Sequence, residues 1–194
     1  ALEKEYQFWM DGEDQLKDRL NHYRRIVRMP DGSVLNRYWD DADTPRAESY
    51  KEDLATVQKA LAQDATLEAQ QMYRHLRAGA ESGWDYSSRW IRPDSLGNYH
   101  LKNIHTTDIV PADLNALLYH LEQRLTLVYH IEQNPEKKAY YFKRAQSRLN
   151  TVRKYLWSET HHFFMDYDTT LETHTPVISV AGMYPLAFHM GTTK

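Results

Sequence analysis

A short segment of the chain combines a carboxylate with aromatic, glycine and hydroxyl side chains. Asp85 lies between Trp84 and Tyr86, and Gly83 precedes it by two residues. Aromatic faces pack against sugar rings, glycine lets the backbone approach a ligand closely, and burial among aromatic rings raises the pKa of a carboxylic acid. Cleavage of a glycosidic bond requires such a proton donor. Taken alone, this segment fits a structural role better, as a helix cap or as an ion pair with Arg89.

Segments on either side change this interpretation. Residues 35–41 and 43–49 precede the Gly-Trp-Asp block, and residues 106–115 follow it. In this order the segments closely resemble the trehalases, most strongly the bacterial ones, and the resemblance runs from about residue 6 to about residue 185. The Gly-Trp-Asp-Tyr-Ser-Ser-Arg-Trp and Asn-Arg-Tyr-Trp-Asp-Asp blocks are long, so they are more specific than a three-residue motif.

The resemblance implies a fold and a mechanism. It implies an all-α chain that forms part of an (α/α)6 toroid with small β-hairpin insertions. It also implies that Asp85 is the general acid of an inverting hydrolase of α,α-trehalose that needs no cofactor. In inverting enzymes the acid and the base lie roughly 6.5–9.5 Å apart, which leaves room for water. No segment here matches the family's base region, so we expect the base outside this chain.

A second motif of the resemblance concerns sugar binding. Arg46-Ala47-Glu48 matches the family's Arg-Pro-Glu triplet, with alanine where proline is usual, and Gly83 matches a position whose backbone contacts sugar. A guanidinium donates hydrogen bonds to sugar hydroxyls in a planar fork, and a carboxylate accepts from them. The structural alternatives are an exposed ion pair at a helix start for Arg46 and Glu48, and a helix C-cap for Gly83.

Length and composition limit the classes of protein. The 194 residues are 41% hydrophobic and 26% charged, which is ordinary for a globular protein with one core. The net charge of −3 gives no basic surface for nucleic acid or membrane, and no apolar stretch is long enough to span a bilayer. No metal-binding spacing of His or Cys occurs. The absence of cysteine does not separate cytoplasm from periplasm, with the cytoplasm slightly favoured.

Hydrophobic spacing predicts the elements. Helices are expected over residues 2–11, 49–62, 66–80, 112–133, 134–156 and 176–188, and hairpins over 23–39 and 163–175. Asn134-Pro135 is a typical helix start, so the two helices that meet there should form an antiparallel hairpin. Asp85 should lie on a loop after a helix. We expect residues 1–194 to be the central portion of a single (α/α)6 catalytic domain, with trehalose and the remainder of a trehalase chain as partners.

Two other functions remain open. An α-glucosidase or mannosidase would share the helical barrel and an acid-bearing loop, although the Thr-Pro-Arg-x-Glu-Ser segment argues against it because it belongs to the trehalose pocket. A non-catalytic helical domain that binds sugar or protein would explain the missing base. Calorimetry with trehalose and maltose, combined with an assay of glucose release, distinguishes these functions.

Overall fold

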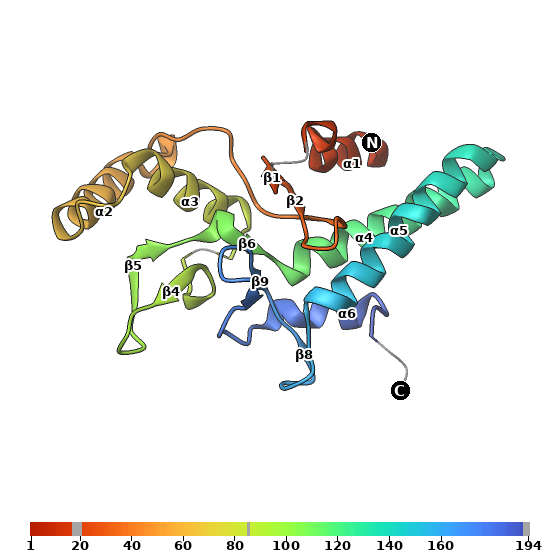
Figure 1. The fold of residues 1–194 in the computed structure, drawn as a ribbon. Coiled ribbons are helices and arrows are strands. Elements are labelled where there is room, and N and C mark those ends of the chain that lie inside the picture. Colours follow the sequence, from red (N-terminus) through yellow and green to blue (C-terminus); the bar gives the residue numbers. More distant parts are fainter. Residues whose placement is uncertain (17–20, 85, 192–194) are drawn as a thin grey trace. The chain divides into compact units, whose positions relative to one another are not determined.

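The chain folds into two compact units. A computed structural model of the protein describes residues 1–16, 21–84 and 86–191. Unit 1 consists of Ala1–Arg37 and Val110–Lys194, and unit 2 of Tyr38–Ile109. Both are mainly helical, with short antiparallel strand pairs, as Figure 1 shows. The expectation that all 194 residues belong to a single domain stays a prediction.

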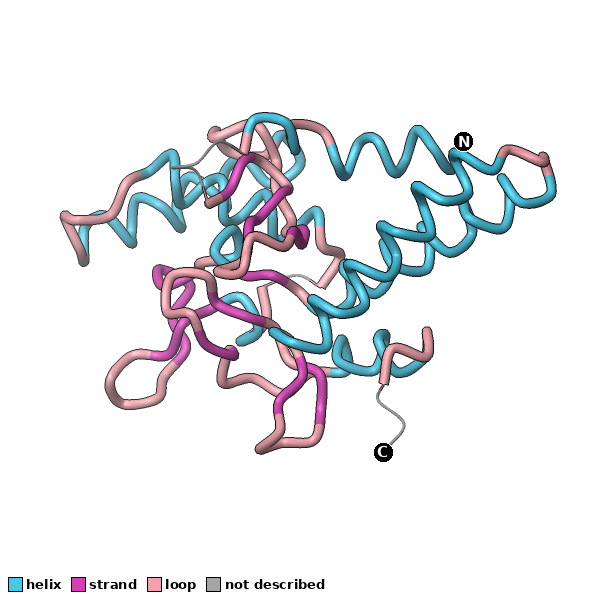
Figure 2. Tube along the Cα trace, turned by 45° about the vertical axis from the view of Figure 1, so that its right-hand side comes forward, coloured by secondary structure: helices cyan, strands magenta, loops and turns pink. Residues whose placement is uncertain are grey.

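A long helical hairpin is the main feature of unit 1. The unit contains helices α1 (Leu2–Met10), α4 (Ala112–Ile131), α5 (Pro135–Tyr155) and α6 (Met183–Ala187). Helices α4 and α5 run side by side in Figures 1 and 2. The Asn134 side chain caps α5 by accepting a hydrogen bond from the Lys137 N–H at 3.0 Å, and Pro135 occupies the first turn. The predicted antiparallel pair is thereby confirmed.

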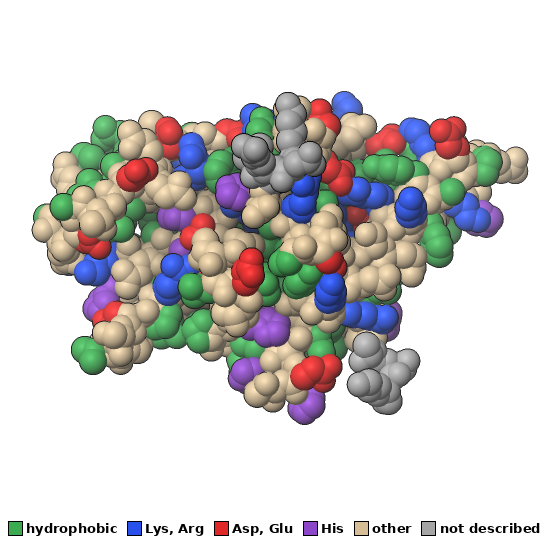
Figure 3. Space-filling model, in the orientation of Figure 1, with side chains coloured by type: hydrophobic (Ala, Val, Ile, Leu, Met, Phe, Trp, Pro, Cys, Tyr) green, Lys and Arg blue, Asp and Glu red, His purple; other side chains and the backbone are tan. Residues whose placement is uncertain are grey.

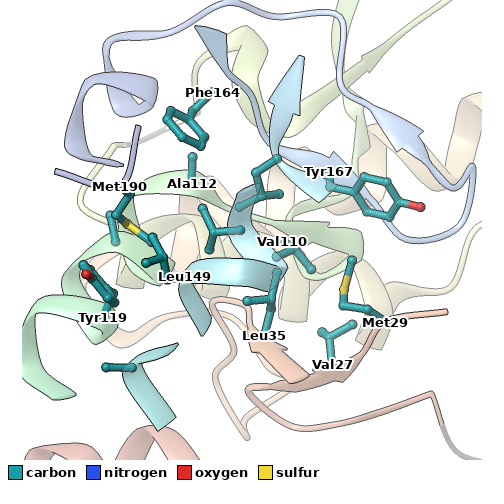
Figure 4. Close-up of a cluster of buried hydrophobic side chains, with 14 residues drawn as sticks. Val27, Met29, Leu35, Val110, Ala112, Tyr119, Leu149, Phe164, Tyr167 and Met190 are labelled. Carbon is teal, nitrogen blue, oxygen red and sulfur yellow. The ribbon is translucent and has the colours of Figure 1, made fainter. Parts of the chain in front are cut away.

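The core of unit 1 lies against this hairpin. The close-up in Figure 4 shows side chains from α4, α5 and the flanking strands converging on one apolar cluster. The buried members are Val27, Met29, Leu35, Val110, Ala112, Ala116, Tyr119, Ala145, Leu149, Val152, Leu156, Phe164, Tyr167 and Met190. In α5 the members recur at spacings of three and four residues, so that one face of the helix is buried. Alanines on both helices leave room for close packing.

A buried polar network joins β3 (Val34–Asn36), α4 and α5 inside unit 1. The Arg148 guanidinium donates from Nε to Glu122 Oε1 at 3.0 Å. Its Nη1 donates to the side-chain oxygens of Asn36 and Asn115, each at 2.9 Å. The Asn115 amide in turn donates to the Asn36 backbone carbonyl at 2.8 Å. The guanidinium and both amide side chains have partners where water does not reach, which offsets the cost of burying them, whereas Glu122 Oε2 is buried without a hydrogen-bond partner among the described residues.

Short strands in unit 1 follow the predicted hairpins only in part. The first sheet has the order β1 (His22–Tyr23), β2 (Ile26–Arg28) and β3, and its β2–β3 pair confirms the hairpin expected over residues 23–39. Strand β9 (Tyr167–Asp168) pairs with β10 (Thr173–His174), and β6 (Ile109–Val110) is the third strand of that sheet.

The hairpin expected over residues 163–175 is wrong in its first part. Strand β8 (Phe163–Phe164) pairs backward with β7 (Trp157–Ser158), where the Trp157 and Phe164 rings pack edge to face with their centroids 5.0 Å apart. Asp168 Oδ1 accepts from the Thr170 and Leu171 N–H groups, and these bonds close the turn directly after β9. Sequence alternation alone does not distinguish these two pairings.

The last predicted helix is also too long. Instead of a helix over 176–188, a 3-10 turn (Val180–Gly182) leads into the short α6. Residues 177, 178 and 180 are β-branched and lose side-chain freedom in a helix. The Ser179 hydroxyl accepts from the Ala181 N–H at 3.3 Å, which starts the helical turn only at that point.

Unit 2 consists of a helix pair and a β-hairpin. Its elements are α2 (Tyr50–Gln63), α3 (Ala69–Glu81), β4 (Ile91–Pro93) and β5 (Tyr99–Ile104). Both helices were predicted, but α3 starts three residues late because the Asp64 carboxylate binds the N–H and hydroxyl of Thr66 in a turn. The β4–β5 hairpin was not predicted. Its turn is closed by the Asp94 carboxylate, which accepts from the backbone of Leu96 and Asn98.

The described surface carries charge of both signs. On the face drawn in Figure 3, acidic and basic side chains are interspersed and do not gather into a region of one sign. Among the described helices, none has the length and apolar character that a bilayer crossing requires. The described residues also contain no group of three or more His, Asp or Glu side chains arranged to hold a metal ion.

Candidate functional site

The loop before α2 carries the Arg-Ala-Glu triplet and is attached to α3 by two arginines. Arg77 Nε donates to Asp40 Oδ2 at 2.9 Å, and Arg74 Nη2 donates to Asp43 Oδ2 at 3.3 Å. Arg77 Nη1 also donates to the carbonyl of Pro45 at 3.4 Å. These contacts link the loop to a rigid helix of the same unit, so the triplet that follows is held in a defined place.

Arg46 is held by Asp53, which lies in the first turn of α2. Arg46 Nε donates to Oδ2 at 3.0 Å and Nη2 donates to Oδ1 at 2.7 Å, which is a bidentate pair. The Arg46 backbone N–H donates to the same Oδ2 at 2.9 Å. The side chains are 13% and 3% exposed. The pair therefore lies at the edge of the interior, with Arg46 still within reach of water.

The charges of this pair stabilise each other. Burial acts to raise the pKa of Asp53, but the hydrogen bonds from Arg46 outweigh it, so the pKa lies below its ordinary value. The hydrogen bond to Asp53 raises the pKa of Arg46, and the negative charge of Glu48 acts in the same direction. Both groups are ionised at neutral pH.

The ring of Tyr86 also lies close to Arg46. The centre of the guanidinium is 5.2 Å from the Tyr86 ring centroid, within the range of a cation–π interaction. The Tyr86 hydroxyl donates to the Leu76 carbonyl at 3.0 Å. A Cβ at Gly79 would lie only 3.0 Å from the ring, so the small residue on α3 makes room for the tyrosine. The residue after Asp85 in sequence is thereby joined to Arg46.

Glu48 and Ala47 follow Arg46 in a short 3-10 turn (Ala47–Ser49), and both are exposed. Among the described residues, no hydrogen bond or ion pair engages the Glu48 carboxylate. Its oxygens are open to a ligand hydroxyl. Ala47 has no polar side-chain atom, so only its backbone can take part in binding.

Gly83 ends α3 in the left-handed conformation, with φ of +71°. Its N–H donates to the Ala80 carbonyl at 3.1 Å, and the preceding Ser82 hydroxyl donates to the Gly79 carbonyl at 2.5 Å. An L side chain is strained at this φ, which accounts for the glycine as a helix terminator. The residue is exposed, so its backbone is also accessible to a ligand.

Asp85, the expected acid, lies outside the described residues. Of the other predicted site residues, Arg46 and Glu48 lie on one turn, and Arg46 is joined to Asp53 and Tyr86. In the described part of unit 2, no hydrogen bond joins Gly83 to the triplet. The sequence patterns did not identify Asp53, because an acidic residue in a first helical turn is ordinarily explained by the helix dipole.

The aromatic residues near the site divide into core and surface. Trp90 and Tyr38 are buried, and their rings pack edge to face with centroids 6.0 Å apart. Trp84 and Trp39 are half-buried, and each has an arginine over its ring, Arg89 and Arg74 respectively. Trp84 and Trp39 therefore remain as residues that can pack on a sugar, while the ring of Tyr86 lies beside Arg46.

Comparison with known proteins places this chain in a family. The family model described as Trehalase matches residues 1–194, and the chain belongs to this family. Among solved structures, it is similar to the neutral trehalase Nth1 from Saccharomyces cerevisiae, with 19% sequence identity and a TM-score of 0.62. The match covers 95% of this chain and 36% of the yeast chain, so this chain spans little more than a third of that protein's length. At this identity the likeness shows the fold alone.

Proposed function

We propose that this chain supplies part of the active site of a hydrolase of α,α-trehalose. Arg46 and Glu48 bind sugar hydroxyls, the backbone of Gly83 contacts the sugar, and Asp85 donates a proton to the glycosidic oxygen. The observation that carries this proposal is the Arg46 guanidinium, which Asp53 fixes on one edge only. Its remaining N–H groups have no partner among the described residues, and the open Glu48 carboxylate follows two residues later.

The mechanism we propose is inverting, with a second carboxylate outside this chain as the base. Water attacks the anomeric carbon on the face opposite Asp85 while the leaving glucose takes the proton. We also propose that the helix pairs belong to an (α/α)6 toroid. Exposed apolar side chains on the α4–α5 hairpin, among them Leu127, Ile131 and Phe142, support this because further helices would cover them.

The acid role of Asp85 is tested by D85N in the natural protein. Asparagine keeps the shape but has no acidic proton, so we expect kcat for trehalose to fall by about 10²–10⁴. α-Glucosyl fluoride has a leaving group that needs no protonation, so its hydrolysis should fall far less. D64N, which changes an Asp in the α2–α3 turn of unit 2, is the matched control.

Two results would contradict the role of Asp85. A D85N variant with more than half of the activity on trehalose has no need of this acid. A variant that is equally impaired on trehalose and on α-glucosyl fluoride has lost something other than proton donation.

A further inference from the structure

Both carboxylate oxygens of Asp53 accept hydrogen bonds from a single residue, Arg46. Both of its oxygens accept from the Arg46 side chain, and Oδ2 also accepts from the Arg46 backbone N–H, at distances of 2.7–3.0 Å. Its side chain is 3% exposed. Because the main chain and the guanidinium are tied to the same group, the Arg46 side chain is held in one rotamer relative to its own backbone.

The Tyr86 ring is a second neighbour of the guanidinium. Its ring lies 5.2 Å from the guanidinium centre, and its hydroxyl is hydrogen-bonded to the Leu76 carbonyl on α3. Gly79 on the same helix leaves the space that the ring fills. Arg46 is therefore held by a carboxylate from α2 and lies beside an aromatic ring supported by α3.

This fixation leaves one edge of the guanidinium unused. An arginine side chain carries about 2 kcal/mol of rotamer entropy, and ordering it at the moment of binding would weaken affinity. Ordering it during folding removes that cost from the binding step. An arginine that served only to stabilise unit 2 would gain from bonding on every edge, and Arg46 does not.

We infer that Asp53 is a positioning residue for substrate binding, which acts together with the ring of Tyr86 by presenting the open edge of Arg46 to a sugar hydroxyl. This inference rests on the proposed role of Arg46 in trehalose binding. It assigns to Asp53 an effect on KM for trehalose that passes through Arg46, with no contact between Asp53 and the sugar.

The test compares D53N, R46A and the double variant in the natural protein. The asparagine of D53N has no charge and turns an amide group toward the guanidinium, so Arg46 loses its bidentate partner. We expect KM for trehalose to rise about tenfold in D53N with kcat within about threefold of the original, and to rise about 10–150-fold in R46A. In the R46A background, D53N should have no further effect on KM.

The matched control is E52Q. Glu52 is the exposed neighbour of Asp53 in the same first turn of α2, so E52Q removes a similar interaction with the helix dipole and leaves Arg46 untouched. Its KM should be unchanged. A second arm, Y86L, removes the ring beside Arg46 while leaving the carboxylate, and should raise KM about twofold to fivefold only when Arg46 is present.

The outcomes distinguish the proposed binding role of Arg46 from the positioning role of Asp53. If R46A leaves KM unchanged, the proposed role of Arg46 is wrong. If R46A raises KM while D53N and Y86L do not, Arg46 binds sugar without needing them and the positioning role alone is overturned. If D53N raises KM by the same factor in the R46A background, Asp53 acts by another route, which also overturns it. Should D53N fail to fold, the KM values of Y86L measured with and without Arg46 decide whether Arg46 is positioned by its neighbours.

Discussion

Two arginines, one in each unit, each form an ion pair with a buried carboxylate, but they differ in how many of their N–H groups have protein partners. In unit 1, Arg148 and Glu122 are 2% and 0% exposed, and Asn36, Asn115 and Met10 accept from other N–H groups of the guanidinium. In unit 2, Arg46 is 13% exposed and meets a carboxylate on one edge only. The first arrangement satisfies a charge in the core, and the second keeps donors available for a ligand.

The difference shows that the role of an ion pair can be inferred from which N–H groups of its arginine have protein partners. Removing two charges from water is costly, so a buried pair whose guanidinium has partners on every edge joins elements without gaining much stability over an apolar core. A pair whose guanidinium has partners on one edge only needs a reason other than stability for leaving the other edge open. For Arg46 that reason is the sugar hydroxyl that we propose for its open edge.

The largest expected effect is on the free energy of unfolding, which should fall more when the Arg148–Glu122 pair is broken than when the Arg46–Asp53 pair is broken. E122A leaves Arg148 buried without its counter-charge and should lower the free energy of unfolding by about 3–5 kcal/mol. D53A leaves Arg46 within reach of water and should cost less, about 1.5–3 kcal/mol. Hydrogen exchange of peptides from α4–α5 and from α2–α3, measured in the natural protein, reports each unit separately.

The control for this comparison is E132A, which truncates an exposed glutamate at the end of α4 and should cost little. If D53A destabilises unit 2 as strongly as E122A destabilises unit 1, the distinction between a guanidinium with partners on every edge and one with an open edge is wrong.

A smaller effect is expected on the stability of unit 2 at acid pH. The pKa of Asp53 is lowered in the folded state, so between the folded and unfolded values the unfolded chain binds more protons. The stability from Asp53 is complete above its unfolded pKa of about 3.9 and is lost as pH falls through the folded pKa. The expected slope is at most about 1.4 kcal/mol per pH unit.

D53N isolates this contribution, because asparagine does not titrate. Urea unfolding between about pH 2 and pH 5 should show a weaker pH dependence for unit 2 in D53N than in E52Q. Equal pH dependence in the two variants would mean that the Arg46–Asp53 pair is not formed in solution.

Sequence patterns predicted the parts of the molecule that depend on local chemistry. The stripe of apolar residues along α4 and α5 and the Asn134 cap specify the helical hairpin by themselves. The family motif pointed to Arg46 and Glu48, whose role in binding stays a prediction. Asp53 was missed because its partner is set by how the chain folds back between residue 46 and the first turn of α2, and no spacing rule encodes that contact.

The errors have the same origin. Strand β8 pairs with β7 in place of β10, and residues 176–179 stay outside a helix, because packing and side-chain hydrogen bonds to the backbone decide between conformations that the apolar pattern permits equally. The acid role of Asp85 stays a prediction, since that residue lies outside the described part of the chain.

The smallest effect concerns Gly83, and it asks whether the backbone of this residue contacts the sugar. An alanine there would be strained at φ of +71°, at a cost of about 1–2 kcal/mol, but its Cβ would meet no described atom within 4 Å. Strain alone changes stability and leaves affinity for trehalose intact. If the backbone of Gly83 contacts the sugar, the new methyl group meets the ligand, and KM should rise several-fold.

G97A is the matched control, because Gly97 has φ of +80°, equal space around it and a place in the β4–β5 turn. Both variants should lose similar stability, and only G83A should lose affinity. Equal KM values would place the sugar away from Gly83 and leave Arg46 and Glu48 as the proposed binding residues of unit 2.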